Sequence, residues 1–185
     1  MEENKKEKIS TKDMVQIAMF TAVVAVLSQI AIPMPSGVPV TLQTLAVALC
    51  GYVLGSKKGA VSLLVYALLG AVGAPVFANF KGGLGAIAGP TGGFIWGFIF
   101  MAFLCGLGIE SKHKWLAVVL GIAGVLVCHA CGAAQFAIIK GNGFWSSALL
   151  VSVPYLVKDF VSVIIALGAA ALIRSRIKVT AAANQ

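Results

Sequence analysis

Six long stretches of the sequence contain almost no charged side chain. A helix needs about 20 apolar residues to cross the hydrocarbon core of a bilayer, and a helix satisfies all its backbone hydrogen bonds internally there. We therefore interpret the stretches as membrane-spanning helices. They cover residues 14–32, 40–54, 60–72, 93–109, 115–139 and 151–173.

The composition excludes a soluble globular domain. Of the 185 residues, 59% are hydrophobic and only 11% are charged, whereas a soluble surface carries roughly 25–35% charged residues. We predict an all-α integral membrane protein with six transmembrane helices. The predicted domains are a cytoplasmic segment 1–13, a six-helix membrane domain 14–173 with an outer loop 74–92, and a cytoplasmic tail 174–185.

The basic residues predict the orientation in the membrane. Cytoplasmic loops carry an excess of Lys and Arg, and with the N-terminus inside, the inner segments hold most of the 14 basic residues. Both termini are therefore expected to be cytoplasmic. The net charge of +8 does not indicate nucleic-acid binding, because no basic patch is interleaved with aromatic residues. The inner basic residues are Lys5, Lys6, Lys8, Lys12, Lys57, Lys58, Lys112, Lys114, Arg174, Arg176 and Lys178.

Segment 70–93 interrupts the apolar pattern with many glycines and with Pro75 and Pro90. This composition excludes a single helix. Because unpaired backbone groups cannot face lipid, the segment must pack on protein or line a watery cavity. Its glycines fit neither the phosphate-loop pattern nor the dinucleotide pattern, and no strand is expected before them, so nucleotide binding is not predicted.

The last predicted helix carries polar residues at a spacing of three and four. Tyr155, Lys158, Asp159 and Ser162 therefore crowd one side of it. Charges within a membrane span cost roughly 2.5–3.5 kcal/mol each, so they need a cavity or polar partners. A structural charge pair is one interpretation. A ligand site is favoured, since adjacent residues on a helix do not face each other squarely and Asp159 is too short to reach far toward the membrane surface.

Two amides are expected on the same outer side. Gln43 stands at the start of the second predicted helix and Asn79 lies in the long loop. Together with the carboxylate and the ammonium of the last helix, they bring polar groups from three segments to a similar depth. Small-molecule pockets combine a few such groups with apolar walls. Phe77, Phe94 and Trp96 could supply these walls or could equally be core residues.

Cys128 and Cys131 form a Cys-x-x-Cys pattern around His129 within an apolar stretch. A zinc site needs four ligands and no second pair is visible, so packing is the favoured interpretation. Contact of His129 with the cavity stays open.

The first predicted helix carries small residues four positions apart. Ala18 and Ala22 form this pair, and Ala25 lies on a neighbouring ridge. Small residues let a second membrane helix approach closely. The pattern indicates either internal packing or, if it faces outward, a docking surface for a partner.

Four segments resemble the biotin-specific substrate-binding (S) component of energy-coupling-factor (ECF) transporters. They are VPVTLQ, LLGAVGAPVFA, GPTGGFIWGF and YLVKD, which cover residues 38–43, 68–78, 89–98 and 155–159. The resemblance implies the S-component fold of six membrane helices in a bacterial cell membrane. It also implies a non-enzymatic subunit without a cofactor that captures biotin from outside. Its partners would be a transmembrane coupling protein and two ABC-type ATPases.

Seven candidate substrate-binding residues and one candidate docking surface follow from the residues and the resemblance together. The substrate-binding candidates are Gln43, Phe77, Asn79, Thr91, Tyr155, Lys158 and Asp159. The docking candidates are Ala18, Ala22 and Ala25. Two other functions would use some of the same residues. An ion-coupled secondary transporter would use Lys158 and Asp159 as a proton relay, and a thiol oxidoreductase would use Cys128 and Cys131.

Overall fold

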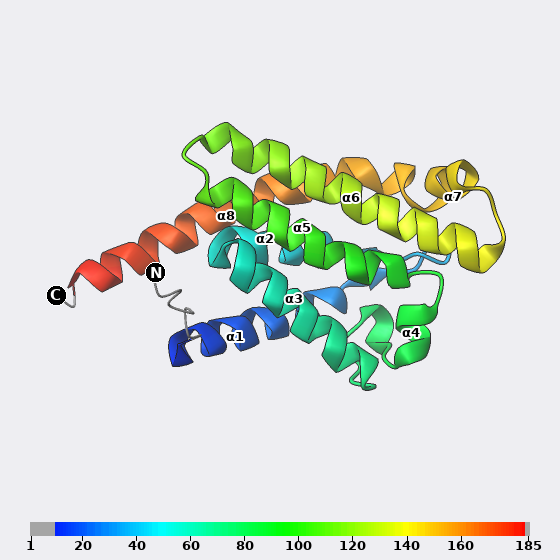
Figure 1. Cartoon of the computed structure of the whole chain (residues 1–185), viewed down its shortest axis with the longest axis horizontal. Coiled ribbons are helices and arrows are strands. Elements are labelled where there is room, and N and C mark those ends of the chain that lie inside the picture. Colours follow the sequence, from blue (N-terminus) through cyan, green and yellow to red (C-terminus); the bar gives the residue numbers. More distant parts are fainter. Residues whose placement is uncertain (1–9, 184–185) are drawn as a thin grey trace, which may run out of the picture.

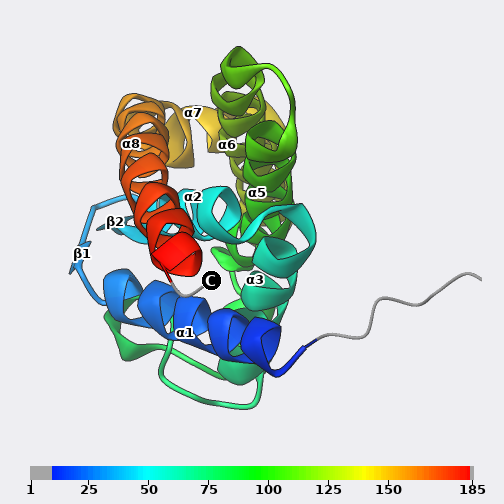
Figure 2. The ribbon, with the colours of Figure 1, turned by 90° about the vertical axis from the view of Figure 1, so that its left-hand side faces the viewer.

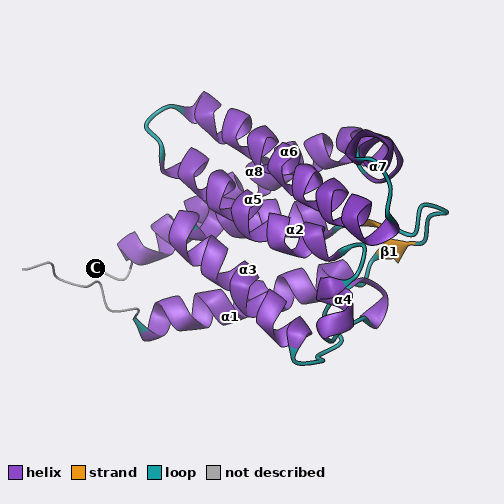
Figure 3. Cartoon of the chain, turned by 45° about the vertical axis from the view of Figure 1, so that its right-hand side comes forward, coloured by secondary structure: helices purple, strands orange, loops and turns teal. Residues whose placement is uncertain are grey.

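The computed structural model describes the backbone of residues 10–183 and the side chains of residues 10–176. Most of this part of the chain is helical (Figure 3). The major helices are α1 (Thr11–Ser28), α2 (Gln43–Leu54), α3 (Ser56–Ala71), α5 (Gly92–Glu110), α6 (Lys114–Lys140) and α8 (Val153–Ala183).

Each major helix matches a predicted apolar stretch. Most ends are displaced by up to four residues, whereas α8 extends to Ala183, ten residues beyond the predicted end at residue 173. The displacement has a local cause at α1, where Ser10 forms a capping box: its hydroxyl accepts from the backbone N–H of Asp13 at 3.1 Å. Such a cap satisfies an N–H that has no partner within the helix. The predicted boundary at residue 14 consequently falls inside α1. The predicted boundary at residue 173 also falls inside a helix, because α8 continues to Ala183. Residues 1–9 and 184–185 of the predicted terminal segments lie outside the described residues.

Within the described chain, four helices are long and apolar enough to cross a membrane: α1, α5, α6 and the part of α8 from Val153 to Arg176. The 12 residues of α2 and the 16 of α3 give about 18 and 24 Å at 1.5 Å per residue, less than the roughly 30 Å hydrocarbon core. The structure is thus that of an all-α protein with four candidate spans. Six crossings remain a prediction.

Helix α2 is the centre of the bundle. It contacts α1, α3, α5 and α8, which surround it when the molecule is viewed from one end (Figure 2). Large apolar side chains remain exposed on the outer helices, including Val157 and Leu172 of α8, which are 75% and 71% exposed. Such outward apolar faces suit a lipid environment.

Helices α5 and α6 pack closely through glycines. A Cβ atom added to Gly97 would lie 2.7 Å from the Cα of Cys128, and one added to Gly108 would lie 2.7 Å from the Cα of Ala117. Membrane helices associate through such close approach of small residues. The contact fixes the position of the residues that follow Cys128 on α6.

The short elements gather at one end of the bundle. They are the antiparallel strands β1 (Ala31–Ile32) and β2 (Val40–Thr41), the 3-10 helix η1 (Ala78–Phe80), α4 (Leu84–Ala88) and α7 (Phe144–Val151). The start of α1 and the end of α8 lie at the opposite end (Figure 1). The predicted loop 74–92 contains η1 and α4, so it is not one helix, as expected.

The last predicted helix, 151–173, is interrupted at its start. Helix α7 ends at Val151 and α8 begins at Val153, with Ser152 between them in a non-helical conformation. Pro154 has no N–H to continue the hydrogen bonds of α7. This break starts a new helix whose first turns carry the polar residues predicted for the site.

Candidate functional site

A cavity lies among α2, α5, α6 and α8 and the loops at the end that carries the short elements. Its volume is about 90 Å³. A single water needs roughly 10–15 Å³, so the cavity has room for a small organic group. All seven substrate-binding candidates line it: Gln43, Phe77, Asn79, Thr91, Tyr155, Lys158 and Asp159.

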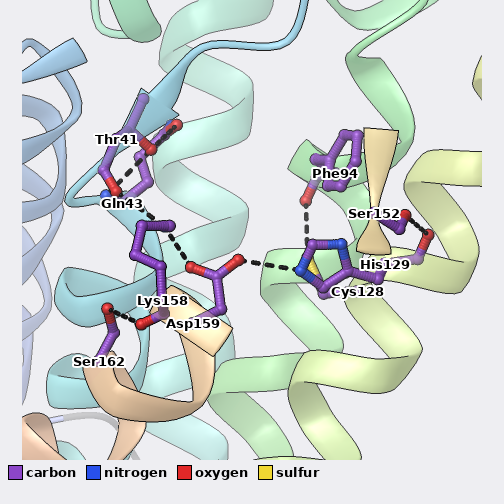
Figure 4. Close-up of polar contacts among 9 residues, drawn as sticks. All are labelled: Thr41, Gln43, Phe94, Cys128, His129, Ser152, Lys158, Asp159 and Ser162. Carbon is purple, nitrogen blue, oxygen red and sulfur yellow. Dashed lines mark hydrogen bonds and ion pairs between the residues drawn. The ribbon is translucent and has the colours of Figure 1, made fainter. Parts of the chain in front are cut away.

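Lys158 and Asp159 form an ion pair on the cavity wall (Figure 4). The lysine ammonium pairs with Oδ1 of Asp159 and also donates to the carbonyl oxygen of Thr41 at 3.0 Å. Adjacent residues on a helix do not face each other squarely, but the long lysine side chain bends back to the carboxylate, so the charge pair that the sequence left open is present. The pair is nevertheless open to the cavity, because both residues line it.

His129 is the third member of this cluster. Its Nε2 lies 2.9 Å from Oδ2 of Asp159, and both side chains are buried. The imidazole ring also meets the ring of Phe94 edge-on, with centroids 5.6 Å apart. The contact of His129 with the cavity, left open by the sequence, is present: the residue lines the wall.

Gln43 lines the cavity and also bonds a side chain of the protein interior. Its Nε2 donates to the hydroxyl of Tyr66 at 2.7 Å, and that hydroxyl donates to the carbonyl oxygen of Val76 at 3.1 Å. The side-chain oxygen of Gln43 accepts from the hydroxyl of Thr41 at 3.3 Å. The amide is thus oriented by Tyr66 and Thr41 at the point where α2 begins, and its conformation is set before any ligand enters.

Two segments form the outer part of the cavity wall. Tyr155 holds the first, which includes Gly37 and Val38, by donating its hydroxyl to the carbonyl oxygen of Val38 at 2.7 Å. The second contains Phe77 and Asn79. Asn79 has a φ of 58°, a left-handed conformation that Asn tolerates better than most residues.

Apolar side chains complete the wall, as expected for a ligand pocket. Phe77, at 4% exposure, packs against Tyr66 with ring centroids 5.3 Å apart, and Phe94 also lines the cavity. The prediction for Trp96 is wrong: it is 42% exposed and does not line the cavity. On α5, Trp96 lies two positions after Phe94, which corresponds to a rotation of about 200° around the helix axis, so the two side chains face opposite ways.

Several wall residues were not among the seven candidates. Besides His129 they include Thr44, Lys81, Phe98, Met101 and Val125. Thr44 directly follows Gln43, and Lys81 is the lone basic residue of the long loop, so these two had a signal in the sequence. The apolar ones had none, because they do not differ from other residues of a membrane helix.

The docking candidates divide between two faces of α1. Ala18 and Ala22 are exposed, whereas Ala25 is half-buried and packs against the core. Val26 continues the exposed face instead.

The four cysteines are free, so Cys128 and Cys131 form no disulfide. Among the described residues, no group of three or more His, Cys, Asp or Glu side chains forms a metal site.

Comparisons with known proteins agree with this architecture. The BioY family matches residues 2–179. The biotin transporter BioY of Thermotoga maritima is 44% identical over 122 residues, which cover 65% of this chain and 72% of that protein. The probable biotin transporter BioY of Pyrococcus horikoshii is 38% identical over 153 residues, which cover 83% and 90%. A crystal structure of the S-component for biotin from an ECF-type ABC transporter superposes with a TM-score of 0.78 at 25% identity, covering 89% of this chain and 91% of that one.

A bundle of apolar helices around a cavity with a few oriented polar groups defines a membrane protein that binds a small solute. The chain belongs to the BioY family. The resemblance found in the four sequence segments is thereby confirmed, and the structural match extends it to the fold.

Proposed function

We propose that this chain is the biotin-binding subunit of an ATP-driven ECF importer. It would capture biotin from outside and deliver it together with a transmembrane coupling protein and two ABC-type ATPases. The observation that carries the proposal is the convergence of seven residues from separate segments on one cavity. Family membership and the relatives named as biotin transporters support it.

The chemistry of the cavity suits biotin. Biotin has a ureido ring with two N–H donors and one carbonyl acceptor, an apolar thioether ring and a carboxylate. Asp159 can accept from a ureido N–H, Lys158 can donate to either acceptor, and Asn79 and Gln43 can do both. Hydrogen bonds to charged groups are the stronger ones, particularly when water is excluded. The apolar ring would lie against Phe77 and Phe94.

The remaining parts of the proposal concern assembly and orientation. The chain would be a non-enzymatic subunit that needs no cofactor of its own, with biotin as cargo, and energy would come from the ATPases. It would lie in a bacterial cell membrane with both termini in the cytoplasm, which puts the cavity on the outer side. The exposed pair Ala18 and Ala22 would meet the coupling protein. An ion-coupled secondary transporter is not favoured, since the named relatives and the matched S-component are biotin transport proteins.

The direct test is biotin binding by the chain alone. We expect the protein purified in detergent to bind biotin with a stoichiometry of one in titration calorimetry. Absence of binding to the correctly folded chain would reject the proposal. Uptake of biotin into liposomes by the chain alone, driven by an ion gradient, would instead support the secondary transporter.

A further inference from the structure

The ion pair and the histidine contact at Asp159 differ in how well they are shielded. The side chains of His129 and Asp159 are 9% and 6% exposed, whereas that of Lys158 is 30% exposed. Lys158 is also a long, flexible side chain, while the imidazole has only two rotatable bonds. Of the two groups that hold the carboxylate, the lysine is the movable one and the histidine is the fixed one.

Three contacts determine the position of His129, two of them with α5 and one with the break between α7 and α8. Its ring meets Phe94 of α5 edge-on, and its carbonyl oxygen accepts from the hydroxyl of Ser152, at the break between α7 and α8, at 3.3 Å. The preceding residue, Cys128, lies against Gly97 of α5. The imidazole therefore projects from a rigid part of the bundle toward α8 (Figure 4).

The contact between His129 and Asp159 indicates which ring nitrogen of His129 carries a proton. A carboxylate only accepts, so Nε2 of His129 donates to Oδ2 of Asp159. The other ring nitrogen, Nδ1, is buried and has no hydrogen-bond partner among the described residues. Nε2 is therefore the ring nitrogen that carries the proton of this contact.

We propose that His129 is a positioning residue for ligand binding. This inference rests on the proposed function. Its Nε2–H holds the carboxylate of Asp159 in place, so that the ammonium of Lys158 can leave the ion pair and bind the ligand. Without His129, Asp159 would have Lys158 as its main charged partner, and the ligand would compete with the carboxylate for the ammonium. Binding would then weaken although neither Lys158 nor Asp159 had changed.

Two amide variants test this inference. In His129→Gln, the side-chain amide reaches approximately the place of Nε2 and can still donate to Asp159, whereas in His129→Asn it reaches only the place of Nδ1. We expect biotin affinity, measured by calorimetry, to fall roughly 10- to 100-fold in His129→Asn and about 3-fold or less in His129→Gln. His113→Asn is the matched control. His113 is the chain's other histidine; its side chain is exposed and does not line the cavity.

A double-mutant cycle separates positioning from packing. If His129 acts through the charge of Asp159, His129→Asn should change affinity by only about 3-fold or less in an Asp159→Asn background. Equal losses in His129→Gln and His129→Asn, or the same loss in both backgrounds, would overturn the inference while biotin binding by the wild type stands. A wild-type chain that does not bind biotin would overturn the proposed function and this inference together. Thermal unfolding in detergent identifies variants that are misfolded.

Discussion

At the scale of single residues, the central feature is a buried carboxylate in an apolar helix bundle. Asp159 is 4% exposed, and its charge is balanced by Lys158 and a hydrogen bond from His129. A buried ion pair is weak evidence for stability, because the desolvation of two charges offsets much of their attraction. Its place on the wall of a cavity makes it a candidate for a use in ligand binding instead.

Replacing the carboxylate tests that use. We expect Asp159→Asn to keep the fold and to weaken biotin binding by about 2–5 kcal/mol, the scale for unpairing a buried charged hydrogen bond. Titration calorimetry measures the change. Ser162→Ala is the control, because its hydroxyl bonds to the carbonyl oxygen of Lys158 one turn away and does not line the cavity. Unchanged affinity in Asp159→Asn would contradict the assignment of the site.

At the scale of elements, the end of α1 holds one segment of the cavity wall. The hydroxyl of Ser28 donates to the carbonyl oxygen of Val76 at 2.6 Å, and Gln29 bonds this carbonyl at 3.2 Å. The side-chain oxygen of Gln29 also accepts from the N–H of Phe80 at 2.9 Å. These contacts flank Phe77 and Asn79, so α1 and the outer wall of the cavity are joined.

Loosening this junction should speed the escape of ligand. We expect Gln29→Ala to raise the dissociation rate of biotin about 3- to 10-fold, since each lost hydrogen bond contributes about 0.5–1.5 kcal/mol. A competition experiment with labelled biotin measures the rate. Gln16→Ala, at the other end of α1 with only a 3.5 Å contact to Lys58, should leave the rate unchanged. An equal rate in the two variants would show that the junction does not retain the ligand.

The packing of α5 against α6 belongs to the same scale. Gly97 leaves no room for a Cβ beside Cys128, and overpacking of this kind costs about 1–3 kcal/mol. We expect Gly97→Val to lower the midpoint of thermal unfolding in detergent and to weaken biotin binding, because it displaces His129. Gly85→Ala is the control, since an added Cβ there meets no atom within 4 Å. A wild-type midpoint for Gly97→Val would contradict the close packing.

At the scale of the whole molecule, one exposed face of α1 is built from small residues. Ala18 and Ala22 face outward, and the exposed Val26 lies one turn further along. A helix of another subunit can approach closely over the two alanines. The face lies on the same helix whose C-terminal end holds the cavity wall, so the proposed partner binding and ligand retention would both involve α1.

Bulky residues on this face should separate binding from assembly. We expect Ala18→Phe and Ala22→Phe to bind biotin like the wild type but to lose co-purification with the coupling protein, because the phenyl ring prevents close approach of the helices. Val161→Phe, on the exposed apolar surface of α8, should keep both properties. Retained assembly in both alanine variants would reject the docking surface.

The sequence by itself determined that the protein lies in a membrane. It also determined the approximate positions of the major helices and the seven candidate residues that line the cavity. Charge-free stretches mark membrane helices because lipid excludes charge, and polar residues stand out against them. The break at Ser152 was not predicted, although Pro154 was a signal for it. Among the apolar wall residues, Phe98, Met101 and Val125 gave no signal, because they do not differ from other residues of a membrane helix.

Only the tertiary structure decided which faces of the helices meet. Helical periodicity relates Ala18, Ala22 and Ala25 to one another, but not to the bundle, and Ala25 turned out to pack inward. In a soluble protein the apolar face would have pointed to the core. In a membrane protein, lipid and core are equally apolar, so the pattern does not distinguish them. His129 and Asp159 are 30 residues apart in the sequence. Their contact depends on how α6 packs relative to α8, which helical periodicity does not determine.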